Sequence, residues 1–169
     1  MRQLISVVST SVNSISNLSS TTNVNIDFAD LLKQAKEQLN QATVQPEAQE
    51  IQEVKRELLL DNEDTIMALA RTRIQLEHLL RRSLGKRTQY SNKPQGDVKF
   101  LSAGRLYRMF LKEFDNYQYL EGSFDYVLKI CNAAIHGQQV PASQAQEALE
   151  LGARLISTLK ELVGVENEF

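Results

Sequence analysis

Residues 65–84 have the sequence TIMALARTRIQLEHLLRRSL, and Gly85 follows them. Apolar side chains recur every three or four positions here, which is the spacing of one face of an α-helix. The expected buried stripe consists of Ile66, Leu69, Ala70, Leu76, Leu80 and Leu84. Because glycine commonly follows the last turn of a helix, we predict that this helix ends at Gly85.

The same periodicity predicts helices over most of the remaining chain, and no sustained two-residue alternation predicts a strand. The expected helices cover residues 28–42, 47–60, 101–114, 119–136 and 141–163. Asp27 is the expected cap of the first. Residues 86–97 contain Gly, Pro, Asn and Ser, which favour a flexible loop.

The N-terminal part of the chain is expected to differ from the rest. Residues 1–25 are rich in Ser, Thr and Asn, so their helix propensity is poor, although apolar residues recur at helical spacing. We predict an amphipathic arm that gains order only against a partner or the body of the fold. The overall prediction is an all-α, antiparallel helical bundle over residues 61–169, preceded by an arm and helical extension over residues 1–60.

The composition excludes several classes of protein. A chain of 169 residues is long enough for a core that folds unaided, and no apolar run is long enough to span a bilayer. The single Cys131 forms no internal disulfide and suits a reducing compartment, so we expect a cytoplasmic protein. With one cysteine and two histidines, we expect no metal site and no cofactor.

Charge is strongly segregated along the chain. Residues 71–112 hold 11 basic and 2 acidic side chains, whereas residues 1–70 hold 5 and 10. A segment this basic is typical of a surface that binds a polyanion such as RNA. The candidate phosphate-binding residues are Arg81, Arg82, Lys86, Arg87, Arg105 and Arg108. The alternative is that the basic helix lies against acidic helices of the same bundle.

The most informative polar pattern is at residues 129–137, KICNAAIHG. Lys129, Asn132 and His136 are spaced to lie on one helical face. Gly137 follows the last turn, where helices commonly end in a left-handed residue. A histidine can accept a proton from a ribose hydroxyl, a cation can stabilise the developing phosphate charge, and Asn132 can orient the imidazole. The alternative is that Asn132 and His136 bond to each other or to a neighbouring helix end.

This stretch resembles the signature of the HEPN superfamily (higher eukaryotes and prokaryotes nucleotide-binding domains), in which an arginine and a polar residue precede a histidine. Residues 70–77, ARTRIQLE, together with Asn132-x-x-x-His136-Gly137, are similar to an uncharacterised HEPN-related bacterial family associated with restriction and defence proteins. The resemblance covers about residues 65–163. It implies a helical bundle, a homodimer with a composite site, and metal-independent ribonuclease activity in active members.

The chain departs from the active HEPN pattern at one position. Cys131 stands where the resemblance implies the motif arginine, and a cysteine provides neither a fixed charge nor a bidentate phosphate contact. Lys129 is one substitute. Arg73 is another: it lies on the apolar stripe, and a charge that faces the interior needs a partner, which Glu77 supplies one turn later. We expect this pair to pack near His136 and to contribute the missing guanidinium. The alternative for Arg73–Glu77 is a structural ion pair that fixes helix register.

Two functions therefore stay open. In the first, the protein is a HEPN-like binding or assembly domain of a nucleic-acid-associated or antiviral defence system, with a degenerate nuclease motif. In the second, it is a metal-independent endoribonuclease in which His136 is the acid/base, Asn132 orients it, and Lys129 or Arg73 holds the phosphate. The expected partners are a second copy of the chain, RNA or another nucleic acid, and a larger defence complex, and we expect no membrane span.

Overall fold

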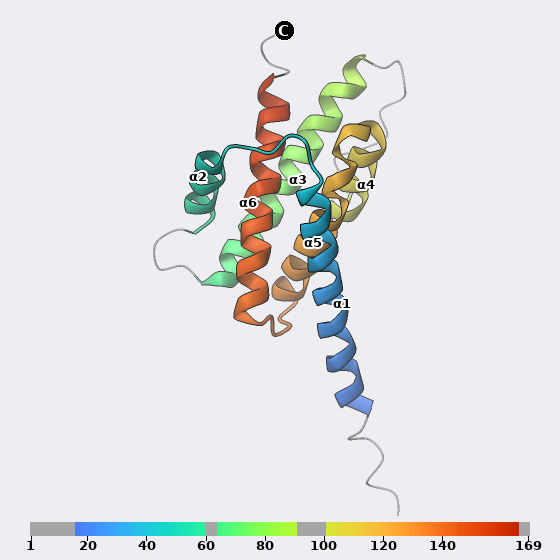
Figure 1. Cartoon of the computed structure of the whole chain (residues 1–169), viewed down its shortest axis with the longest axis vertical. Coiled ribbons are helices and arrows are strands. Elements are labelled where there is room, and N and C mark those ends of the chain that lie inside the picture. The colour runs from blue at the N-terminus through green and yellow to red at the C-terminus, as the bar shows by residue number, and fades with distance from the viewer. Residues whose placement is uncertain (1–15, 60–63, 91–100, 166–169) are drawn as a thin grey trace, which may run out of the picture.

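The computed structural model describes residues 16–59, 64–90 and 101–165. These residues form six α helices and one short 3-10 helix, with no strand among them, so the all-α prediction is confirmed (Figure 1). The elements are α1 (Ser16–Asn40), α2 (Ala48–Leu58), α3 (Thr65–Tyr90), α4 (Ala103–Glu113), η2 (Asp115–Leu120), α5 (Glu121–Ile135) and α6 (Ala142–Val165).

Helices α3, α5 and α6 pack against one another and form the centre of the bundle. Figure 1 shows α6 beside α3, with α2 on the outer side of α6; α1 packs along α5, and its first turns extend beyond the end of the bundle. Each helix contributes apolar side chains to one continuous hydrophobic core, and Ala35 and Leu39 of α1 and Leu58 of α2 belong to it. The boundary at residue 60 stays a prediction, because residues 60–63 lie outside the described part.

Most of the stripe expected on α3 is buried. Leu69, Leu76, Leu80 and Leu84 are within the core, whereas Ile66 is 47% exposed and lies outside it. Ile66 is in the first turn, which begins at Asp64: the Asp64 side chain accepts a hydrogen bond from the Ile66 amide at 3.3 Å. The helix start is thus fixed by a polar cap, and burial begins one turn later.

Two helix ends differ from the prediction by more than two residues. Helix α1 begins at Ser16 and runs through Asp27, so Asp27 is not its cap, and residues 16–25 are helical; residues 1–15 lie outside the described part. Helix α3 continues past Gly85 to Tyr90, so residues 86–90 are not loop, while residues 91–97 are outside the description. Propensity is a weak guide here, since one glycine costs a helix only about 1 kcal/mol and can be outweighed by neighbouring contacts.

Helices α3 and α6 approach closely at Gly152. A Cβ atom at this position would come within 2.5 Å of the Thr72 Cγ2 atom. Thr72 is fully buried and its hydroxyl donates to the Ala68 carbonyl at 2.8 Å, so its side chain cannot turn away without losing that hydrogen bond. The α3–α6 spacing therefore depends on the absence of a side chain at Gly152.

We predict that Gly152→Ala lowers the free energy of unfolding by about 1–3 kcal/mol, because the added methyl group overpacks the α3–α6 contact. The matched control is Gly85→Ala, where a Cβ meets nothing within 4 Å. This control should raise stability by about 0.5–1 kcal/mol through helix propensity. Urea unfolding followed by circular dichroism measures both, and equal effects of the two substitutions would contradict the close approach.

Candidate functional site

The C-terminal end of α5 has a well-defined backbone geometry. Gly137 has φ of 74°, the left-handed conformation expected after a helix. The Gln138 amide donates to the Ala133 carbonyl at 2.9 Å, and the Gly137 amide donates to the Ala134 carbonyl at 3.1 Å. This pair of hydrogen bonds is a Schellman motif, so the sequence prediction for Gly137 is confirmed and the backbone of His136 is held in place.

Lys129, Asn132 and His136 are all exposed on α5, whereas Ile130, Cys131 and Ala134 are buried. The spacing of three and four residues therefore places the three polar side chains on the solvent-facing side of the helix. We call this group the α5 polar face. Because these side chains are exposed, a phosphate group of a ligand in solution can contact them.

Asp125 lies one turn before Lys129 and connects α5 to α4. The Tyr107 hydroxyl donates a hydrogen bond to the Asp125 carboxylate, and the Arg108 guanidinium lies 5.8 Å from the centre of the Tyr107 ring. Burial raises the pKa of Tyr107, and the hydrogen bond to Asp125 raises it further, so the phenol stays protonated. Tyr107 was not predicted from the sequence, because its partner is 18 residues away and no local pattern links the two residues.

Cys131 does not supply a positive charge beside Asn132. Its side chain is 0% exposed, and burial raises the pKa of the thiol to about 12. The positive charge of Arg73 lowers the pKa of the same thiol, but by less than burial raises it. The thiol is thus neutral at ordinary pH, and the guanidinium of Arg73 lies within electrostatic reach of the residue next to Asn132.

Arg73 and Glu77 form the ion pair that their spacing predicted. The Arg73 Nε atom is 3.1 Å from Glu77 Oε1, and Arg81 Nη2 is 3.2 Å from Glu77 Oε2. Arg81 also donates to the Leu101 carbonyl at 3.1 Å, which joins α3 to the start of α4. The side chains of Arg73, Glu77 and Arg81 are 27%, 20% and 33% exposed. Arg73 is therefore at the edge of the core and is not enclosed by the apolar stripe.

The candidate phosphate-binding residues fall into three groups. Arg82, Arg105 and Arg108 are exposed on α3 and α4. Arg81 is half-buried and is engaged by Glu77 and Leu101. The side chains of Lys86 and Arg87 lie outside the described part of the chain. The exposed arginines of the first group are available to an external anion.

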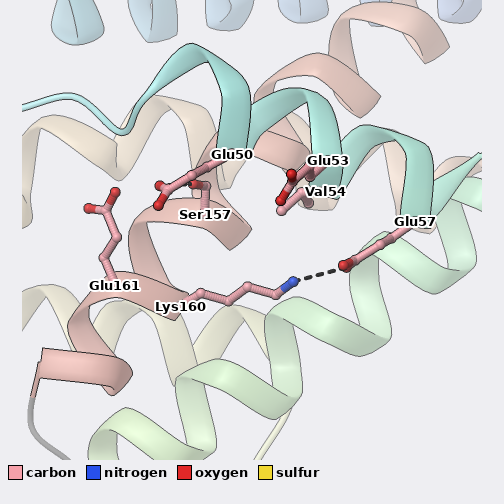
Figure 2. Close-up of a pocket in the computed structure, with 7 residues that line it drawn as sticks. All are labelled: Glu50, Glu53, Val54, Glu57, Ser157, Lys160 and Glu161. Carbon is pink, nitrogen blue, oxygen red and sulfur yellow. Dashed lines mark hydrogen bonds and ion pairs between the residues drawn. The ribbon is translucent and has the colours of Figure 1, made fainter.

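A separate acidic groove lies between α2 and α6, at a distance from the α5 polar face along the bundle. Its volume is ≈ 290 Å³, and Figure 2 shows its lining residues, Glu50, Glu53, Val54, Glu57, Ser157, Lys160 and Glu161. Lys160 pairs with Glu57 at 2.9 Å, and Ser157 donates to Glu50 at 3.3 Å. This groove was not predicted from the sequence, because residues 107 positions apart in the chain, Glu50 and Ser157, meet in it.

Neither metal coordination nor membrane crossing has support in the described residues. Within residues 16–59, 64–90 and 101–165, no three His, Cys, Asp or Glu side chains are grouped so that they could hold a metal ion. Over the same ranges, each helix is too short or too polar to span a bilayer.

Comparisons of the chain with protein-family models, with curated proteins and with solved structures found no match.

We predict that Glu77→Gln lowers the free energy of unfolding by about 1–2 kcal/mol, because two half-buried guanidinium groups lose their shared carboxylate. The matched control is Glu37→Gln on α1, whose partner Lys33 is 4.0 Å away with both side chains largely exposed. That exposed pair should contribute less than about 0.5 kcal/mol. If the two substitutions had the same effect in urea unfolding, Glu77 would not be a structural hub.

Proposed function

We propose that the protein is a HEPN-like helical domain that binds RNA or another nucleic acid through the α5 polar face and the exposed arginines of α3 and α4. The observation that carries the proposal is the exposure of Lys129, Asn132 and His136 on one side of α5. Together these side chains offer an ammonium group, an amide and an imidazole to a phosphate. The arginines add a charge-based, sequence-independent contribution to affinity.

The neutral thiol of Cys131 supports binding as the first function, in preference to catalysis. A phosphotransfer site needs a fixed positive charge near the phosphate, and a buried thiol with a pKa of about 12 provides none. Lys129 supplies only a point charge on a flexible stem. A degenerate nuclease motif that keeps the histidine but loses the rigid cation is consistent with a binding or assembly role.

The assignment to a restriction or antiviral defence system, and the homodimer, rest on the resemblance of residues 70–77 and 132–137 to the HEPN-related family. One feature of the described surface is compatible with a second copy. Ile74 and Met67 on α3 and Ile135 on α5 are exposed apolar side chains. Exposed apolar side chains of this kind are buried in many protein–protein interfaces.

A metal-independent endoribonuclease is the second candidate, and the position of Arg73 favours it. Its charge acts on the buried thiol of Cys131, so its guanidinium is within electrostatic reach of that position from the inner side of α5. In this alternative, His136 accepts the ribose 2′-hydroxyl proton, Asn132 orients the imidazole, and Arg73 or Lys129 holds the phosphate. The carboxylate of Glu77 would fix the orientation of Arg73.

We predict salt-sensitive binding of single-stranded RNA, measured by fluorescence anisotropy. The combined variant Arg82→Gln, Arg105→Gln, Arg108→Gln should reduce the slope of log K against log salt by about 2, at roughly 0.7 per lost phosphate contact. The control variant Lys33→Gln, Lys36→Gln, Arg56→Gln removes the same charge from α1 and α2. A salt-independent affinity, or equal effects of the two variants, would contradict the proposed surface.

The two functions are separated by incubating labelled RNA with the protein in EDTA. The binding proposal predicts no cleavage above that of a mock preparation. Cleavage that persists in EDTA, vanishes in His136→Ala and falls in Arg73→Lys would reverse the ranking in favour of the endoribonuclease. Circular dichroism of each variant provides the control for folding.

A further inference from the structure

A second cavity lies beside the acidic groove, and two tyrosines are among its lining residues. It has a volume of ≈ 440 Å³ and lies between the α1–α2 connection, η2 and α6. Its lining residues are Gln41, Ala42, Thr43, Val44, Pro46, Asn116, Tyr117, Tyr119, Thr158 and Glu161. We call it the tyrosine pocket. A volume of this size is within the range of ligand-binding cavities, and Val44 remains 72% exposed at its edge.

The two tyrosine rings are held in place by the aromatic core. The centres of the Tyr117 and Tyr119 rings are 6.3 Å apart at 27°. Tyr117 also contacts Phe110 at 5.7 Å and Phe114 at 6.3 Å, and both phenylalanines are buried. Rings fixed in this way offer a preformed surface on which a planar cation can stack without ordering the side chains at the moment of binding.

Glu161 is the one ionisable group common to the tyrosine pocket and the acidic groove. Figure 2 shows its carboxyl group pointing toward that of Glu50 across the groove. Burial raises the pKa of Glu161, as do the hydrogen bond with Glu50 and the charges of Glu50 and Glu47. A proton shared between these two carboxyl groups removes one negative charge. The groove still holds four glutamates and one lysine, so it keeps an excess of negative charge.

The neighbouring cations do not offset this excess. Lys160 is engaged by Glu57 at 2.9 Å, and Lys55 pairs with Glu150. Ser157 lines the groove from the same helix as Glu161, and Glu50 lines it from α2. Tyr119 on η2 is also close to Glu161, and its pKa is raised by burial and by the charges of Tyr117 and Glu161. None of these supplies a positive charge.

We propose that the tyrosine pocket binds the side chain of an arginine in an extended segment of a partner protein. A guanidinium group is planar and weakly hydrated, so it can stack on Tyr117 or Tyr119 while it pairs with the Glu161 carboxylate. Val44 and Pro46 offer apolar contacts to the residues that flank the arginine. Charge complementarity selects a basic partner over a neutral or acidic one.

This site is distinct from the α5 polar face. His136 lies just before the start of α6 at Ala142, whereas Glu161 lies near the end of this helix. At about 1.5 Å per residue, the length of α6 from Ala142 to Glu161 is roughly 28 Å. The inference goes beyond the proposed nucleic-acid binding and does not depend on it. The two sites also differ in charge, since one is cationic and the other anionic.

The test uses the full chain and an N-acetylated, C-amidated peptide with a central arginine flanked by alanines, followed by NMR backbone shifts. We expect saturable shifts at Tyr117, Tyr119 and Val44. The same peptide with citrulline, which has the shape of arginine without its charge, should bind at least about fivefold more weakly. Glu161→Gln should weaken arginine-peptide binding by a similar factor, whereas Glu53→Gln, in the adjacent groove only, should leave it unchanged.

Proton linkage gives a second readout. Because the arginine pairs with the ionised form of Glu161, affinity should rise with pH through the raised pKa of that carboxyl, and this pH dependence should disappear in Glu161→Gln. Equal binding of the arginine and citrulline peptides, shifts outside the tyrosine pocket, or equal affinity for free spermidine would overturn the proposal.

Discussion

Helix α5 is buried against α1, α3 and α6, and this burial leaves one narrow face of the helix exposed to solvent. Ile130 and Ala134, four residues apart, share the buried face of the helix with Cys131. Lys129 and Asn132, three residues apart, share the exposed face. The same packing brings Arg73 of α3 within electrostatic reach of Cys131. The proposed phosphate-binding surface is therefore a consequence of core packing.

Much of the helical architecture was predictable from sequence, since Leu69, Leu76, Leu80 and Leu84 repeat at helical spacing and are buried. Helix ends were harder to predict. The stop at Gly137 was correct because a left-handed glycine and two reverse hydrogen bonds follow the last turn, whereas Gly85 lies inside α3. A glycine has the same identity in both settings, and the tertiary contacts that decide between them are not visible in the local sequence.

In the candidate site too, features set by local sequence were predictable, and features set by tertiary contacts were not. The α5 polar face depends on periodicity within one helix, and the pairing of Arg73 with Glu77 depends on a spacing of four residues; both were predictable. The contact of Tyr107 with Asp125 and the convergence of Tyr119 and Glu161 join distant segments. No local pattern indicates such pairs, so the tyrosine pocket became visible only in three dimensions.

The most direct test of the account maps where a short single-stranded RNA contacts the protein, by NMR titration of backbone and imidazole resonances. The account predicts saturable shifts at Lys129, Asn132 and His136, extending to Arg108 on α4, with no change at Tyr119 or Glu161. Saturation without any shift on the α5 polar face, or the absence of binding at low salt, would contradict its central claim.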